Sequence, residues 1–184
     1  MKVLVAVASK HSGTALIASV IGDTLVDEGM QVTVSAPEEV QSVKAFDAVI
    51  AGSGVYGGHW LKAAREFVER HAADLASRPV WLFSSGPIGD PPKPTEDPVD
   101  AAPMVEMAHA LGHRVFAGVL DKGELGLGER AIVRALRVPM GDFRDLDEVS
   151  AWAREIAVAL RGNNQEQAAG PPQGATPSDD WRTP

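Results

Sequence analysis

The chain has 184 residues, 45% of them hydrophobic and 23% charged, which is enough apolar material for the core of one ordinary domain. Its net charge of -8 argues against nucleic-acid binding, because that depends on basic side chains that neutralise phosphates. It contains no cysteine, which excludes disulfides, thiolate metal sites and thiol catalysis. We expect a cytoplasmic protein without a membrane span, since no segment reaches the ~20 apolar residues of a membrane helix.

The first half of the chain alternates short apolar runs with a helical pattern. Val3 to Val7 is a continuous, β-branched run, typical of a strand buried on both faces of a parallel sheet. A helical stripe follows between Leu16 and Leu25, and Gly29 is placed to end that helix. Two more strands are predicted at Gln31 to Ser35 and at Ala48 to Gly52.

The same alternation continues through the second half. After a longer helix, a fourth strand is predicted at Val80 to Phe83. A helix near Met104 to Leu111 and a fifth strand near Val115 to Leu120 come next, and Glu129 to Arg137 is predicted to form a short helix.

The end of the chain divides into a helix and a tail. Apolar residues between Val149 and Leu160 stand at helical spacing, and Asp147 or its neighbour is placed to cap this last helix. From Gly162 onward the composition changes to Asn, Gln, Gly, Pro and Ser. We therefore expect one domain over residues 1–161 and a disordered C-terminal tail over residues 162–184.

Five strands alternating with helices predict an α/β fold, a doubly wound five-stranded parallel sheet with right-handed crossovers. In such sheets ligands bind outside the carboxyl ends of the strands, at the topological switch point. The functional residues are therefore expected in the three loops that follow the first, third and fourth strands.

The loop after the first strand leads into a helix N-terminus, where backbone N–H groups and the helix dipole attract anions. A small phosphate monoester fits best, because neither the P-loop nor the dinucleotide-binding glycine pattern is present here. As an alternative, Ser12 or Thr14 merely caps the helix. The candidate residues of this loop are Ser9, Lys10, His11, Ser12, Gly13 and Thr14.

The other two loops are rich in glycine. The loop from Gly52 to Trp60 suits a flat ring lying against backbone, although ordinary packing of Tyr56 and Trp60 is an alternative. The loop from Ser84 to Asp90 has small residues that permit close approach to a ligand, or it is a simple turn. The candidate residues are Gly54, Val55, Tyr56, Gly57 and Gly58 in the former, and Ser85, Gly86, Pro87 and Ile88 in the latter.

At these loops the sequence resembles the flavodoxin superfamily. It looks closest to the flavodoxin-domain branch that includes menaquinone-dependent protoporphyrinogen dehydrogenase, and the resemblance covers roughly residues 1 to 160. The similar stretches are Val7 to Ala18, Gly52 to Trp60, Phe67 to His71 and Trp152 to Ala157.

The resemblance implies a flavodoxin-like fold with FMN as cofactor. The first loop would hold the FMN phosphate, and the other two would flank the isoalloxazine ring, with Tyr56 as the stacking residue. The implied function is that of a redox protein, an electron carrier or a flavin-dependent oxidoreductase, which acts with a redox partner protein or a small-molecule acceptor. Gly13 stands one position later than the glycine of the family's usual order, which predicts an altered backbone dihedral there.

Two other functions are compatible with the fold class. One is a non-redox binding module that kept the fold and binds FMN weakly or not at all. The other is an NAD(P)-binding or receiver-like domain, which the absence of the corresponding fingerprints argues against. No metal site is expected, since the histidines are scattered. The residue pattern identifies neither a catalytic residue nor an oligomeric state.

Overall fold

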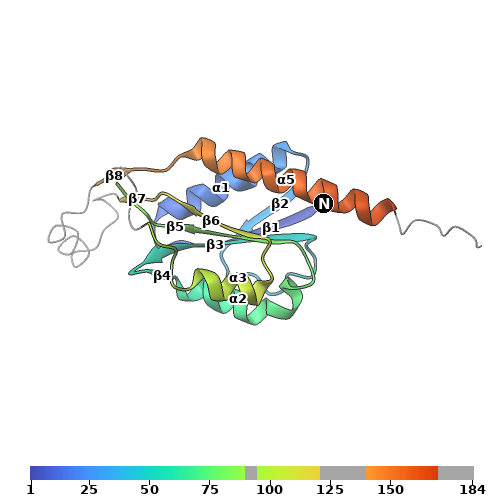
Figure 1. Cartoon of the computed structure of the whole chain (residues 1–184), viewed down its shortest axis with the longest axis horizontal. Coiled ribbons are helices and arrows are strands. Elements are labelled where there is room, and N and C mark those ends of the chain that lie inside the picture. Colours follow the sequence, from blue (N-terminus) through green and yellow to red (C-terminus); the bar gives the residue numbers. More distant parts are fainter. Residues whose placement is uncertain (90–94, 121–139, 170–184) are drawn as a thin grey trace, which may run out of the picture.

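Residues 1–89, 95–120 and 140–169 are described by a computed structural model, and they form a parallel sheet with helices on both faces (Figure 1). The strands lie in the order β2-β1-β3-β5-β6, and each neighbouring pair along this path is parallel. The predicted doubly wound parallel sheet of five strands is therefore confirmed. The bounds are Lys2–Ala8 for β1, Gln31–Ser35 for β2, Ala48–Tyr56 for β3, Val80–Ser85 for β5 and Gly112–Phe116 for β6.

In the described ranges, two helices cover each face of the sheet. Figure 1 shows α1 and α5 on one face and α2 and α3 on the other. None of these helices is long and apolar enough to cross a membrane. Their bounds are Ser12–Asp27 for α1, Lys62–Leu75 for α2, Ala101–Ala108 for α3 and Leu146–Ala169 for α5.

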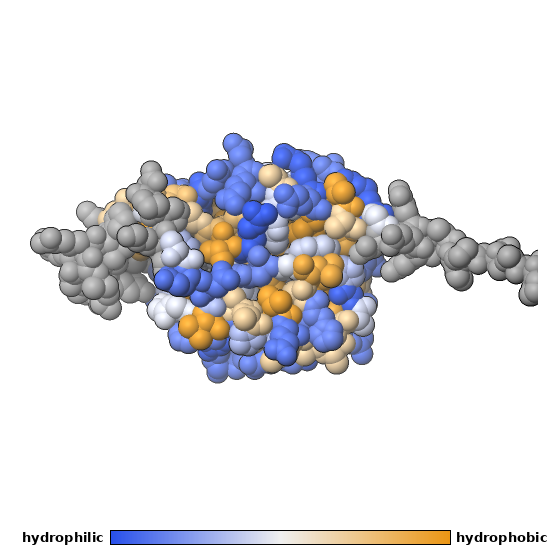
Figure 2. Space-filling model, viewed as in Figure 1, coloured by the Kyte–Doolittle hydropathy of each residue, from blue (hydrophilic) through white to orange (hydrophobic). Residues whose placement is uncertain are grey.

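The sheet separates two hydrophobic cores because successive side chains of a strand point to opposite faces. From β1, Val3 and Val5 pack in the core that α1 and α5 cover, whereas Leu4 and Ala6 pack in the core under α2 and α3. This double burial explains the continuous apolar run from which the strand was predicted. On the face seen in Figure 2, hydrophobic residues form small separate groups among hydrophilic ones.

The C-terminus of α1 confirms the predicted role of Gly29. This residue has a φ of +86°, which L side chains rarely adopt. The Gly29 N–H donates to the Val26 carbonyl at 2.9 Å, and the Met30 N–H donates to the Leu25 carbonyl at 3.0 Å. These two bonds form a Schellman motif, which satisfies carbonyl groups at the helix end and directs the chain into β2.

Both ends of α5 differ from the prediction. The Asp145 carboxylate accepts the Glu148 N–H at 2.9 Å and so caps the helix, whereas Asp147 lies inside the first turn. The helix continues to Ala169, beyond the residue-161 boundary that the change in composition suggested. The rest of the predicted tail, residues 170–184, lies outside the described residues.

The fifth strand also lies earlier than predicted. β6 ends at Phe116, and the next extended pair, Val119–Leu120 (β7), leaves the sheet and pairs antiparallel with Gly141–Asp142 (β8). The turn between β6 and β7 passes through Gly118, whose N–H donates to the Pro87 carbonyl at 2.7 Å. The apolar run of residues 115–120 therefore spans two separate strands.

The helix predicted near Met104 to Leu111 is α3, which starts earlier and stops where His109 adopts a left-handed conformation with a φ of 50°. The helix predicted at Glu129 to Arg137 lies outside the described residues.

The buried side chain of His71 couples stability to pH. His71 of α2 is only 6% exposed, and its ring contacts Phe67 edge-on at 5.0 Å between centroids. Its Nε2 atom has no hydrogen-bond partner among the described residues. Burial disfavours the charged imidazolium and so lowers the pKa of His71 below its ordinary value of 6.5.

The free energy of unfolding is therefore expected to decrease as the pH falls below about 6.5, because the unfolded chain then binds the proton that folded His71 resists. Chemical denaturation at several pH values measures this slope. Replacing His71 with Leu should reduce this slope, whereas replacing the exposed His109 with Asn should leave it unchanged. Equal slopes in all three proteins would contradict the role given to His71.

Candidate functional site

The three candidate loops leave the sheet at one edge. Ala8 of β1 pairs with Ser53 of β3, and Ser53 pairs with Ser84 of β5, so the carboxyl ends of three neighbouring strands lie side by side. From β1 the chain runs through α1 to β2, which lies on one side of β1, and then returns to β3 on the other side of β1. The switch point therefore lies between β1 and β3, where open α/β sheets bind their ligands.

The first loop positions the start of α1. His11 is the residue before the helix, and it makes no side-chain capping hydrogen bond. The Ser9 hydroxyl donates to the His11 carbonyl, which closes the loop. Because Ser12 and Thr14 lie inside the first turn, neither is the capping residue that the alternative interpretation required. This turn contains no acidic side chain, which suits an anion.

Position 13 has no room for a side chain, which accounts for its glycine. A Cβ atom there would lie 2.5 Å from Cγ1 of Val119, whereas Gly13 does not have a positive φ. The altered dihedral expected at this shifted glycine stays a prediction, and close packing of β7 on α1 explains why a glycine stands there. The Arg144 guanidinium donates to the Gly13 carbonyl at 3.2 Å, and Asp142 holds it by bonds of 2.8 and 2.6 Å.

The second candidate loop is a β-hairpin. β3 continues to Tyr56, and His59–Trp60 (β4) pairs antiparallel with Val55 and Tyr56. Gly57 and Gly58 form the turn with φ values of 58° and 84°, the left-handed pair that a tight two-residue hairpin requires. The predicted loop from Gly52 to Trp60 is thus the end of β3, a two-residue turn and β4, and only Gly57 and Gly58 form the turn.

The hairpin contacts the first loop. The centroids of the Tyr56 and His11 rings are 6.2 Å apart, and the Lys10 ammonium lies 5.5 Å from the centroid of the Tyr56 ring. A Cβ atom on Gly54 would lie 3.0 Å from the Thr14 hydroxyl and 3.1 Å from the Tyr56 ring. An aromatic ring and a cation thus lie beside the N-terminus of α1.

The third loop packs against the hairpin. Ser85 belongs to β5 and is 5% exposed, so the strand is longer than predicted. A Cβ atom on Gly86 would lie 2.9 Å from Cβ of Val55, which explains why the backbone needs a glycine there. Pro87 accepts the Gly118 N–H, and Ile88 follows, half-buried. The hairpin, this loop and the β6–β7 turn therefore form one packed unit.

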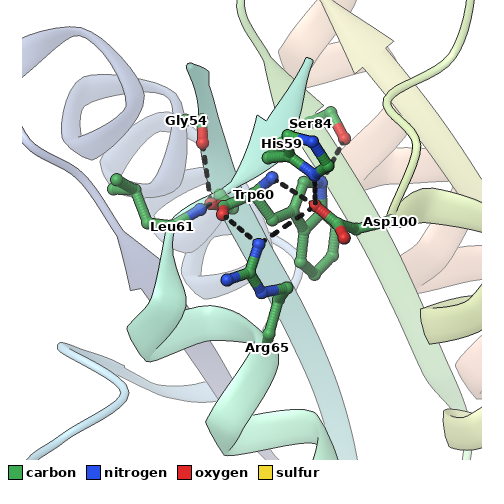
Figure 3. A network of polar contacts seen from close by, with 8 residues as sticks. Gly54, His59, Trp60, Leu61, Arg65, Ser84 and Asp100 are labelled. Carbon is green, nitrogen blue, oxygen red and sulfur yellow. Dashed lines mark hydrogen bonds and ion pairs between the residues drawn. The ribbon is translucent and has the colours of Figure 1, made fainter. Parts of the chain in front are cut away.

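Polar groups attach the hairpin to α2 and to the start of α3 (Figure 3). The Asp100 carboxylate accepts the Trp60 N–H at 2.8 Å and lies 3.2 Å from His59 Nδ1 and 3.4 Å from the Arg65 guanidinium. The Ser53 hydroxyl accepts the Leu61 N–H at 2.9 Å. These contacts fix β4 against α2 and the start of α3.

The charge of Asp100 is stabilised in this position. Burial alone raises the pKa of the carboxyl, but hydrogen bonds from the Trp60 backbone, His59 and Arg65 outweigh it and hold the pKa below the ordinary 3.8. Near Gly13, hydrogen bonds from Arg144 lower the pKa of Asp142 in the same way. Both carboxylates are therefore ionised throughout the neutral pH range.

A groove of about 660 Å³ lies beside the three loops, at the carboxyl ends of β1 and β2. It shares Ser9 and Lys10 with the first loop, and Leu61, Glu38 and Glu39 also line it. No residue of the hairpin turn or of the third loop lines it. The groove is thus adjacent to the three-loop site and distinct from it.

Residues 4–147 match the family model of the flavodoxin domain. The chain belongs to this flavodoxin domain family. Flavodoxins are FMN-binding redox proteins, so the fold class, cofactor and redox function predicted from the resemblance are confirmed at the level of the family.

Individual relatives are distant. The flavodoxin domain described here is 23% identical over 172 residues to protoporphyrinogen IX dehydrogenase [quinone] of Escherichia coli strain K12, covering 85% of this chain and 95% of that protein. An archaeal flavodoxin superimposes with a TM-score of 0.60 at 17% identity over 88% of this chain and 99% of its own. A flavodoxin of Streptococcus pneumonia TIGR4 gives a TM-score of 0.58 at 18% identity, over 86% and 99% of the two chains. These structural likenesses show the fold.

Replacing Asp100 with Ala should loosen the hairpin, because the Trp60 N–H, His59 and Arg65 lose their shared acceptor. We expect the free energy of unfolding at neutral pH to decrease by about 1–3 kcal/mol, the usual cost of such a loss. Urea denaturation measures it. Replacing the exposed Asp97 with Ala is the matched control and should cost under about 0.5 kcal/mol. If both variants have wild-type stability, Asp100 does not anchor the hairpin.

Proposed function

We propose that this flavodoxin domain binds FMN at the three loops described above and works as a redox protein. The observation that carries the proposal is the convergence of the α1 N-terminus, Lys10 and Tyr56 at the β1–β3 switch point. A phosphate site beside an aromatic ring matches the two ends of FMN. When bound, FMN supplies the capacity to accept and donate electrons.

The phosphate end of FMN fits the first loop. The N–H groups of the first helical turn have no acceptor within their own helix, and no side chain from residue 11 caps them. Ser12 and Thr14 add hydroxyl groups, and Lys10 adds positive charge near the turn, whereas the Ser9 hydroxyl donates to the His11 carbonyl and Arg144 pairs with Asp142. Such a set of donors stabilises a phosphate monoester.

The ring end fits the surface that the second and third loops form together. Gly86 packs directly on Val55, and Gly54 lies close to Thr14 and Tyr56, so backbone without side chains faces a ligand beside Tyr56. Tyr56 is 38% exposed and lies at the rim, where a flat ring can pack against it. We therefore assign the ring contacts to Gly54 to Gly58 and to Ser85 to Ile88.

Electrons would leave through the same rim. The Val99 N–H donates to the Gly58 carbonyl at 3.0 Å, so the 67% exposed Val99 side chain lies beside the hairpin turn. An exposed apolar side chain beside the hairpin turn suits the docking of a redox partner protein or a small-molecule acceptor. The likeness to the Escherichia coli dehydrogenase over 95% of its length favours a flavin-dependent oxidoreductase as the second candidate, beside an electron carrier. A cytoplasmic location stays a prediction.

Replacing Thr14 with Val should weaken the binding of FMN but not of riboflavin, which lacks the phosphate. Valine keeps the shape of threonine and removes only its hydroxyl group. A lost hydrogen bond to a phosphate corresponds to about a tenfold increase in the FMN dissociation constant. Titration calorimetry or quenching of flavin fluorescence measures both constants.

Thr24 offers a matched control in the same helix. It is also buried, and its hydroxyl donates to the Val20 carbonyl at 2.8 Å, far from the loops. Replacing Thr24 with Val should leave the ratio of the FMN and riboflavin constants unchanged. If wild-type protein binds neither flavin, the chain is a module that kept the fold without the cofactor. An equal loss for both flavins in the Thr14 variant would contradict the phosphate site.

A further inference from the structure

A buried chain of hydrogen bonds crosses the sheet below the hairpin. The Trp60 indole Nε1 donates to the Ser84 hydroxyl at 2.7 Å, and this hydroxyl lies 2.8 Å from Nε2 of His113 on β6. Trp60 is 2% exposed and Ser84 is not exposed at all. The chain thus links β4, β5 and β6, with Trp60 and Ser84 shielded from water and His113 half-buried.

The chemistry of these groups decides the direction of each bond. An indole N–H can only donate, so the Ser84 oxygen accepts from Trp60. Since no other acceptor contacts it in the described residues, the Ser84 hydroxyl hydrogen goes to His113 Nε2, which requires a lone pair there. His113 is therefore neutral, with its ring proton on Nδ1. Burial lowers the pKa of His113, in agreement with the neutral form.

Protonation of His113 would disrupt this chain. Both ring nitrogens of an imidazolium are donors, so Trp60 and His113 would then both donate to one oxygen. The Ser84 hydroxyl hydrogen has no other acceptor among its contacts in the described residues. A buried hydroxyl group without an acceptor is unfavourable, and the arrangement must shift to relieve it.

The hairpin depends on this anchor. Trp60 is the last residue of β4 and pairs with Val55, next to the pair of Tyr56 and His59. Its side chain is held by Ser84 and its backbone N–H by Asp100. A displacement of the indole would therefore move the strand that carries Tyr56.

We propose that His113 is a positioning residue of the flavin site: its neutral imidazole holds the β3–β4 hairpin in place through Ser84 and Trp60, and its protonation releases that hold. This inference rests on the proposed function, because it concerns the same three loops.

Other charged groups near His113 do not replace this link. The carboxylate of Asp97 attracts a proton to the ring and only partly offsets burial. Asp100 already binds the Trp60 backbone, His59 and Arg65. Across β5 the register partner of His113 is Leu82, which is apolar. The remaining charged groups on β6 and α3 are Arg114, which pairs with Glu148 and Glu155 of α5, and the exposed Glu106 and His109.

The test compares FMN dissociation constants of the wild type, His113→Gln and His109→Asn between about pH 5 and about pH 8. The Gln side chain offers an oxygen acceptor near the position of Nε2 and does not titrate, so it imitates neutral His113 at every pH. All three proteins should bind FMN alike at about pH 8. At about pH 5 the wild type and His109→Asn should bind about tenfold more weakly than His113→Gln. Comparison at equal pH cancels the titration of the FMN phosphate itself.

A second readout needs no flavin. The Trp60 indole N–H resonance, assigned with Trp60→Phe, should shift with pH in the wild type and stay constant in His113→Gln and in Ser84→Ala. A wild-type indole that does not titrate, or an identical pH dependence of FMN binding in the wild type and His113→Gln, overturns the proposal. If no protein binds FMN at any pH, the proposed function and the positioning role both fail, and the indole titration then tests the hydrogen-bond chain alone.

Discussion

The pairing of β1 with β3 is the constraint on which the site depends. These strands are neighbours in space but are separated in the chain by α1 and β2, so the backbone diverges above their carboxyl ends. The space left there receives the N-terminus of α1 from one side and the hairpin from the other. Because both strands are buried on both faces, the edge that carries the loops is held rigidly by the two cores.

Close backbone approach and buried polar groups then shape this edge. Gly13 and Gly86 let separate segments approach so closely that a Cβ atom would force a neighbour to shift, and Gly54 is nearly as close to Thr14. Ser53 and Ser84 stand at the carboxyl ends of otherwise apolar strands, and each bonds the hairpin. Unpaired, such groups would destabilise the core, but here each has partners and fixes the hairpin beside the first loop. One set of contacts thus serves both the stability of the fold and the positioning of the candidate flavin site.

The strands and the doubly wound class of the sheet could be predicted, because strands buried on both faces produce continuous apolar runs, as at Val3 to Val7. Glycine patterns were ambiguous: Gly57 and Gly58 read as a loop although they close a two-residue turn. The contacts of Asp100 and Arg144 cross 40 and 131 residues of sequence, and only the tertiary fold creates them. The three loops were thus predictable, whereas the groups that hold them in place were not.

The most direct test of FMN binding at the three loops is to map backbone amide NMR shifts on addition of FMN. Binding there predicts that the largest changes fall on residues 9–14, 54–58 and 85–88, with riboflavin producing the changes in the latter two segments and smaller ones in the first. Changes centred on residues 35–39 and 61–63 would instead assign the ligand to the neighbouring groove. That result, or no change at saturating FMN, would contradict the site described here.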